Sequence, residues 1–211
     1  MSNHMKKLFV IAAIISAFAL AVAAQNISDD KNEVSAWGGY SPDSTRIIKA
    51  FGGVSDARFG MFAIRYARTL HNGDSVRLRY TIDGIPAAFL SYPDIEVSGT
   101  PPVARLVRET RYAWGFTPAG LQMNFRNKKK YQPFVDISAG MLFFHHLVPN
   151  FGGTKVNFTP AIGAGLEIER DNGTSFTIGY KFLHISNANR GTSNPGFQNN
   201  LIYVGYKFKS W

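Results

Sequence analysis

The chain has 211 residues, a formal net charge of +9 and no cysteine. Without cysteine it can form no disulfide, and no thiolate is available as a nucleophile or a metal ligand. The length corresponds to one domain, and the sequence contains no phosphate loop, zinc-ligand spacing or nucleic-acid-binding motif.

The N-terminus has the form of a secretory signal peptide. Lys6 and Lys7 precede an almost wholly apolar run, and small residues follow it, so that cleavage is expected after Ala23 or Ala24. The run is short for a transmembrane helix. We therefore expect a signal peptide over residues 1–24 and one domain over residues 25–211. For an exported chain, the basic charge favours an anionic membrane surface as partner, and not nucleic acid.

Alternation of apolar and polar residues dominates the rest of the chain and predicts β-strands. From Phe134 onward, one face of each strand carries the apolar side chains, and the other carries mostly small, polar or charged ones. The eight expected strands are Val34–Ala50, Arg58–Thr69, Ser75–Asp83, Arg111–Phe125, Gln132–Phe144, Val156–Arg170, Thr174–Ser186 and Gln198–Phe208. Pro42 interrupts the first of these, so two short strands are an alternative there.

Short and long connections alternate between these strands. The short ones are His71–Asp74, Asn127–Lys130 and Asp171–Gly173, and the long ones are Gly84–Glu109, His145–Lys155 and Asn187–Phe197. Transmembrane up-and-down barrels have short periplasmic turns and longer extracellular loops. The pattern therefore predicts an all-β fold, namely an eight-stranded antiparallel up-and-down transmembrane β-barrel in the outer membrane with both termini in the periplasm.

A soluble β-sandwich or a lipocalin-like barrel is the structural alternative, and in either the apolar face would point inward. Small residues on the other face favour the membrane barrel, because they fit a narrow interior. These residues are Gly140, Gly163, Gly165, Gly179 and Gly205. Charged residues that share this inward phase are expected to pair in the lumen, and they are Asp136, Glu167, Glu169, Lys181, Lys207 and Lys209.

A histidine and a serine lie two residues apart at the end of the seventh expected strand. His184 and Ser186 share a face, since side chains alternate and the rise is about 3.3 Å per residue. Their phase is that of the apolar, lipid-facing set, so the pair is expected on the outer wall facing the outer leaflet. Histidine with serine makes up two members of a hydrolase triad. The alternative is a pair of ordinary rim residues where the strand leaves the membrane.

The chemistry of such a pair is ester hydrolysis. His184 would act as general base and Ser186 as nucleophile, and Asn187 would donate to the oxyanion. The antiparallel last strand places Gln198 beside His184 as the third group that orients the imidazole, with Asn200 as the second choice.

These residues carry a family resemblance. The signal peptide, the small barrel, the run from His184 to Ala188 and the run from Asn194 to Gln198 resemble the lipid A 3-O-deacylase family, also called acyloxyacyl-hydrolase-like outer-membrane proteins. The detailed resemblance extends from Tyr180 to Tyr206. It implies an outer-membrane serine esterase that removes an ester-linked acyl chain from lipid A. The resemblance further implies lipopolysaccharide as the partner and no cofactor.

The chain departs from this family at one position. The family's His-x-Ser-Asn motif matches His184, Ser186 and Asn187, but Gln198 stands where characterised members carry a glutamate. Glutamine can accept an imidazole N–H bond, but it supplies no full charge. Three carboxylates of the long connection Gly84–Glu109 are alternatives for the acid, and they are Asp94, Glu96 and Glu109.

A non-catalytic small barrel with a structural or adhesive role through its long loops is the alternative function. Arg105, Arg108 and Arg111 fit either contacts with lipid A phosphates or ordinary solvated loop positions. His145 and His146 are neighbours on a strand and point to opposite faces, which favours rim positions over a metal site.

Overall fold

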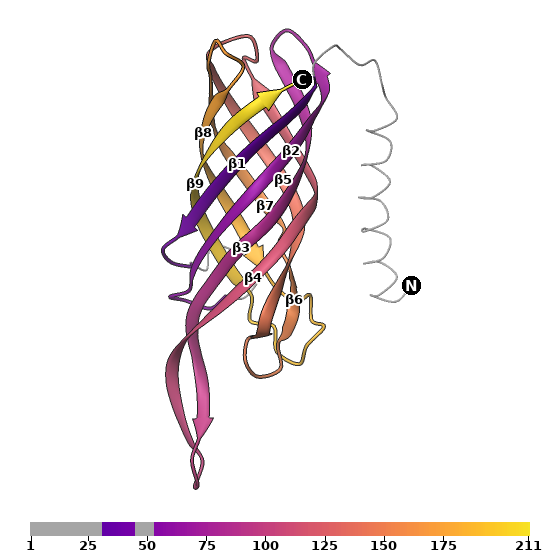
Figure 1. Cartoon of the computed structure of the whole chain (residues 1–211). Helices are drawn as coiled ribbons and strands as arrows, with labels where there is room; N and C mark the ends of the chain where they lie inside the picture. The colour runs from indigo at the N-terminus through magenta and orange to yellow at the C-terminus, as the bar shows by residue number, and fades with distance from the viewer. Residues whose placement is uncertain (1–30, 45–52) are drawn as a thin grey trace, which may run out of the picture.

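The structure is a computed structural model that describes residues 31–44 and 53–211. The expected signal peptide and residues 45–50 of the first expected strand lie outside the described residues. Nine strand segments form one closed antiparallel sheet (Figure 1). They are β1 (Asn32–Ser41), β2 (Arg58–Asn72), β3 (Val76–Ser98), β4 (Val103–Phe125), β5 (Tyr131–Val148), β6 (Thr154–Phe158), β7 (Ala161–Glu169), β8 (Ser175–Ile185) and β9 (Phe197–Ser210). Among the described residues, no helix is long and apolar enough to cross a membrane.

The sheet closes into the expected eight-stranded barrel. Consecutive strands pair with one another, and β1 pairs with β9 to close the ring. The segments β6 and β7 both pair with β5 and together take one position in the barrel. The expected strand Val156–Arg170 is therefore divided at Thr159 and Pro160, because proline has no N–H to give to a ladder.

The two ends of the barrel differ in their connections. At one end, here called the short-turn end, tight turns join β2 to β3, β4 to β5 and β7 to β8 (Figure 1). The C-terminus lies there as well, and Trp211 donates its N–H to the Asn32 carbonyl at 2.9 Å. The other end, called the long-loop end, carries the remaining connections, including the β8–β9 loop over residues 186–196.

The prediction that Gly84–Glu109 is a long loop is wrong. Strand β3 continues to Ser98 and β4 begins at Val103, and their register runs from Ala88 opposite Ala113 to Ser98 opposite Val103. The two strands leave the barrel as a projecting ribbon (Figure 1). Pro86 lies at a bulge of this ribbon and Pro101 lies in its terminal turn, both places where a missing N–H is tolerated.

The ends of two other expected strands also differ in the structure. Strand β5 extends to Val148 and β6 begins at Thr154, so the expected connection His145–Lys155 shrinks to a turn over residues 149–153. Strand β1 ends at Ser41, directly before Pro42. The hairpin strands are thus longer than expected, whereas the first strand stops at its proline.

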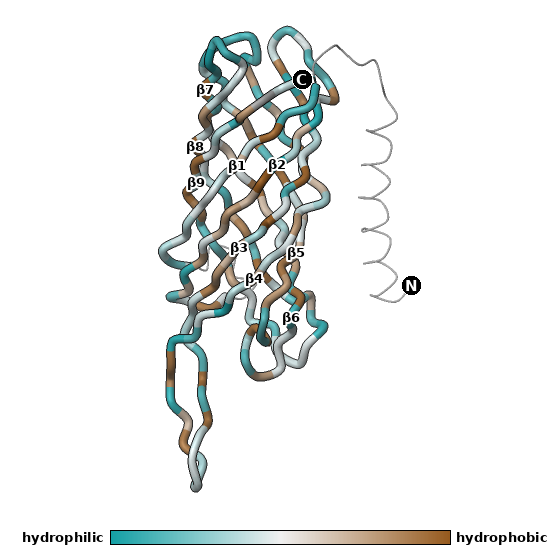
Figure 2. The backbone as a smooth tube through the Cα atoms, in the orientation of Figure 1, coloured by the Kyte–Doolittle hydropathy of each residue, from teal (hydrophilic) through white to brown (hydrophobic). Residues whose placement is uncertain are grey.

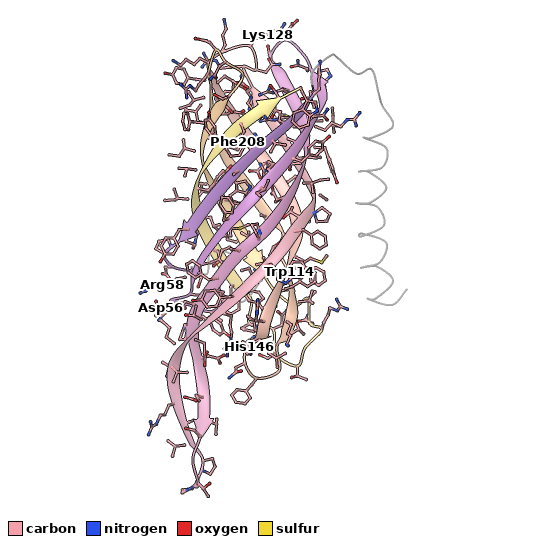
Figure 3. The ribbon with its side chains drawn as sticks, in the orientation of Figure 1. Asp56, Arg58, Trp114, Lys128, His146 and Phe208 are labelled. Atoms are coloured by element: carbon pink, nitrogen blue, oxygen red, sulfur yellow. The ribbon has the colours of Figure 1, made fainter. Side chains whose placement is uncertain are left out.

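The outer wall is apolar. Large apolar side chains that point outward are exposed on every side of the barrel, among them Ile64, Ile137, Ile162, Ile178 and Ile202. Hydrophobic residues recur along the wall, and the turns at the short-turn end are hydrophilic (Figure 2). Exposed aromatic residues lie near both ends, with Tyr112 and Trp114 toward the long-loop end and Tyr131 and Phe208 toward the short-turn end (Figure 3). This is the pattern of a barrel in a lipid bilayer.

The lumen of the short-turn half is filled by paired charges. Arg77 contacts Glu169 at 3.1 Å, Lys207 contacts Glu169 at 2.8 Å, and Arg79 bonds both Glu33 and Glu167. Nearer the middle, Arg65 contacts Asp83 at 2.7 Å and Lys181 bonds Asp136. The expected lumenal pairing is confirmed for Asp136, Glu167, Glu169, Lys181 and Lys207. Nothing is described of the Lys209 side chain.

The lumen of the long-loop half is apolar. Inward side chains there form one buried cluster that includes Phe59, Leu90, Leu142, Leu183, Ile185 and Phe197. The rings of Tyr92 and Phe197 meet edge to face with centroids 5.0 Å apart. The sequence interpretation missed this cluster, because it described the inward face as mostly small, polar or charged along its whole length.

Candidate active site

His184 near the end of β8 and Ser186 directly after it lie on the outer wall at the long-loop end. The intervening Leu183 and Ile185 point inward and are buried, whereas His184 and Ser186 are half-buried. Phe176, Ile178 and Tyr180 continue the same outward face toward the membrane. The two side chains therefore share the outward side of this segment.

Backbone hydrogen bonds hold this strand end on both sides. His184 N–H donates to the Pro160 carbonyl at 3.0 Å. Ser186 and Phe158 exchange two backbone hydrogen bonds, of 2.7 and 3.1 Å. On the other side, the β8–β9 ladder continues to Ile185 opposite Phe197. The break between β6 and β7 therefore lies beside the His184–Ser186 pair.

Asn187 anchors the loop that follows. Its backbone N–H donates to Asn194 Oδ1 at 3.0 Å, and its Nδ2 donates to the Ser193 carbonyl at 2.8 Å. Its side chain is fully buried. The next residues, Ala188 and Asn189, have φ of 53° and 60°, which is the left-handed region that costs non-glycine residues strain. Its backbone N–H and its Nδ2 therefore both hold the loop in place.

The third expected residue lies in register with the histidine. Gln198 is the β9 partner of His184, and it is fully buried. Paired residues on one face of an antiparallel sheet have Cβ atoms about 5 Å apart. Asn200 is opposite Phe182, and its side chain accepts a 2.5 Å hydrogen bond from the Tyr180 hydroxyl. Gln198 is therefore better placed than Asn200 to contact the imidazole.

The other candidate carboxylates lie elsewhere and have other neighbours. Glu109 contacts Arg111 at 3.1 Å, and Asp94 accepts the Asn150 N–H at 3.0 Å. Glu96 is paired in register with Arg105 on the projecting ribbon. His145 and His146 are both exposed (Figure 3 labels His146). The described part of the chain contains no group of three or more His, Cys, Asp or Glu residues that could hold a metal ion.

The β5–β6 turn packs against the loop that Asn187 anchors, a contact that sequence reasoning missed. Ser193 N–H donates to the Gly152 carbonyl at 2.8 Å. Gly152 has a φ of +71°, and a Cβ there would lie 2.3 Å from Thr192 Oγ1. The position therefore requires glycine. The Gly152-Gly153 pair was the available signal, but a glycine pair alone does not indicate which loop it approaches.

Residues 64–207 match the lipid A 3-O-deacylase (PagL) family. The chain belongs to this family. Among solved structures, the crystal structure of the outer membrane enzyme PagL is similar, with 18% identity over 84% of this chain and 99% of that chain, and a TM-score of 0.51. This likeness shows the fold, and family membership agrees with a barrel in the outer membrane.

Two further solved structures are similar at lower scores. Neisserial surface protein A (NspA) has 12% identity over 84% of this chain and 96% of its own, with a TM-score of 0.47. Ail, the attachment invasion locus protein of Yersinia pestis, has 13% identity over 86% and 100%, with a TM-score of 0.42. No curated protein sequence matches the chain significantly.

Proposed function

We propose that the chain is an outer-membrane serine esterase that removes an ester-linked acyl chain from lipid A. The observation that carries this proposal is the pairing of His184 with Gln198 beside Ser186 on the lipid-facing wall of a barrel from a deacylase family. Barrels of this class place their longer loops outside the cell. With the long-loop end outward, the pair meets the outer leaflet, where lipid A is the acylated lipid.

The reaction proceeds in two acyl transfers. His184 takes the proton of Ser186 Oγ, which attacks the ester carbonyl of lipid A. The bond to the sugar oxygen breaks, that oxygen receives the proton from His184, and the acyl group remains on Ser186. His184 then deprotonates a water that attacks the acyl-enzyme, releasing the fatty acid and returning the proton to Ser186.

Two further residues support these steps. Asn187 is fully buried and bonds its own loop, so it supports these steps by holding the chain that follows Ser186 in place. Gln198 Oε1 accepts an imidazole N–H bond and keeps the ring in the required tautomer. Since glutamine is neutral, it stabilises the imidazolium less than glutamate would. We therefore expect a slow enzyme.

The test is the mass of lipid A from cells that express the wild type or Ser186→Ala. We expect the wild type to produce lipid A that lacks one acyl chain, and the Ser186→Ala cells to keep the complete molecule. Thr110→Ala, which removes an exposed hydroxyl at the same end of the barrel, is the matched control and should behave as the wild type. Complete lipid A in wild-type cells that contain folded barrel would refute the proposal.

The second candidate is a binding or adhesive role without catalysis, and the projecting ribbon favours it. Ile95, Val97 and Leu106 are 52, 50 and 77% exposed there, beyond the end of the barrel wall. Under this role, lipid A stays intact in the same experiment, and shortening the ribbon abolishes attachment to surfaces.

A further inference from the structure

A shallow apolar groove crosses the outer wall over β1–β4, apart from the His184–Ser186 pair. Its lining includes the aromatic residues Tyr40, Phe62, Phe89 and Tyr112, and its volume is about 350 Å³. Gly60 and Ala87 also line it. Strand β9 separates this groove from β8 in the sheet.

Small residues and a bulge make the groove possible. The Phe89 ring lies directly over Gly60, where an added Cβ would come within 2.4 Å of a ring carbon. The β2–β3 register shifts between Phe62 and Ile64, and the exposed Ala87 is the partner of Phe62. The small residues therefore leave a depression in the outer wall among the aromatic side chains.

Two arginines border the groove at its long-loop side. Arg58 lies two residues beyond Gly60 on the same outward face of β2 and is exposed (Figure 3). Its register partner is Ser91, whose carbonyl accepts a hydrogen bond from Arg108 at 3.4 Å. Arg108 also donates to the Asp56 carbonyl at 3.1 Å and bonds its carboxylate. Within the described residues, no carboxylate pairs with Arg58, so the border keeps a net positive charge.

We propose that this groove binds a molecule of lipid A separate from the one that is hydrolysed. A phosphate group contacts the guanidinium groups of Arg58 and Arg108, and one acyl chain lies between the rings. Guanidinium is the side-chain group that best matches phosphate geometry. An acyl chain gains little from an apolar wall alone, since the membrane around it is equally apolar. The charged border next to an apolar depression is what selects a phosphorylated, acylated lipid.

This inference needs only the outer-membrane location and does not rest on the proposed hydrolysis. The test therefore uses the Ser186→Ala protein, purified in detergent, so that added lipid A remains intact. Native mass spectrometry counts the lipid A molecules bound to each barrel. Bisphosphorylated lipid A is the probe, with its dephosphorylated form and phosphatidylglycerol as comparisons.

Two variants address the two parts of the groove in this background. Arg58→Glu reverses the charge of the border, and Ala87→Trp fills the depression. Each should weaken binding of the second lipid A about tenfold, as expected for loss of one charge-assisted contact or of chain packing. Arg105→Glu on the ribbon and Ala164→Trp on the exposed face of β7 are the matched controls, and they should leave binding unchanged. Heat-dependent gel migration verifies that each variant is folded.

The outcomes are decisive in both directions. Loss of the second lipid A in both variants, with weaker binding of the dephosphorylated form, supports the inference. Binding of one lipid A only by the parent protein, or equal binding by Arg58→Glu or Ala87→Trp, overturns it. Equal binding of phosphatidylglycerol, or a protein dimer that Ala87→Trp disrupts, also overturns it. Unchanged lipid A in cells that express the wild type would refute hydrolysis but not this site.

Discussion

The two halves of the barrel interior are built from opposite chemistry. The short-turn half holds Arg77, Arg79, Lys207 and their glutamates in one ion-pair network, whereas the long-loop half holds a buried apolar cluster. The candidate active site lies on the outside of the apolar half. Leu183 and Ile185 of that cluster alternate along β8 with His184 and Ser186. The difference suggests that the charged half fixes the barrel, and that apolar packing positions the site.

Loss of a lumenal carboxylate is the largest change that this comparison predicts. Glu167 bonds Arg79, lies 3.7 Å from Arg77 and 3.6 Å from Lys207, and accepts the Ser175 hydroxyl at 2.8 Å. Glu167→Gln keeps the shape of the side chain but removes the negative charge that faces the buried Arg77, Arg79 and Lys207. We expect the free energy of unfolding to fall by about 4 kcal/mol. Urea unfolding in lipid vesicles measures it.

Glu96→Gln on the exposed ribbon is the matched control and should change the free energy of unfolding little. Deacylation per folded molecule should be the same for Glu167→Gln as for the wild type. A loss of activity greater than the loss of folded protein would show that the charged half also positions the site.

Truncation in the apolar half should reduce both stability and activity. Leu183→Ala removes a buried side chain directly beside His184, and large-to-small core changes of this kind cost about 3 kcal/mol. The cavity also loosens the strand end, so deacylation per folded molecule should fall. The control is Ile178→Ala on the lipid-facing side of the same strand, which should be milder because lipid replaces the lost contacts. Equal effects of both variants would contradict the supporting role of the cluster.

The sequence predicted the outer wall better than the interior or the ends. Period-two alternation identified the outward face of the last four expected strands, because lipid demands an apolar surface wherever a strand crosses. The register that sets Gln198 opposite His184 followed from counting along two adjacent strands and is observed, whereas the role of Gln198 beside the imidazole stays a prediction. Alternation says only that inward residues differ from outward ones. It therefore missed the inward Leu142, Leu183 and Ile185 as one cluster.

The loops were less predictable for a different reason. Residues 84–109 were expected to form a loop, but the cross-strand ladder from Ala88 to Ser98 shows that strand pairing continues there. Contacts such as Ser193 with Gly152 join loops that are far apart in sequence, so no local pattern encodes them. The role of Asn187 as an anchor for its own loop also became visible only with its partners in place.

The smallest predicted effect concerns the missing acid of the candidate triad. Gln198→Glu places a carboxylate opposite His184, and a charged acceptor stabilises the imidazolium more strongly than an amide. We expect deacylation to be about tenfold faster, which corresponds to about 1.4 kcal/mol of transition-state stabilisation.

Gln132→Glu makes the same chemical change in the charged half, where Gln132 accepts an Arg77 hydrogen bond at 3.0 Å, and it should leave the rate unchanged. Initial rates on lipid A in detergent, compared per folded molecule, measure both variants. Because Gln198 is fully buried, its replacement by glutamate also carries a desolvation cost, so unfolding should be followed in parallel. A folded Gln198→Glu protein that is no faster than the wild type would mean that Gln198 does not orient His184, and that the third member of the triad lies elsewhere.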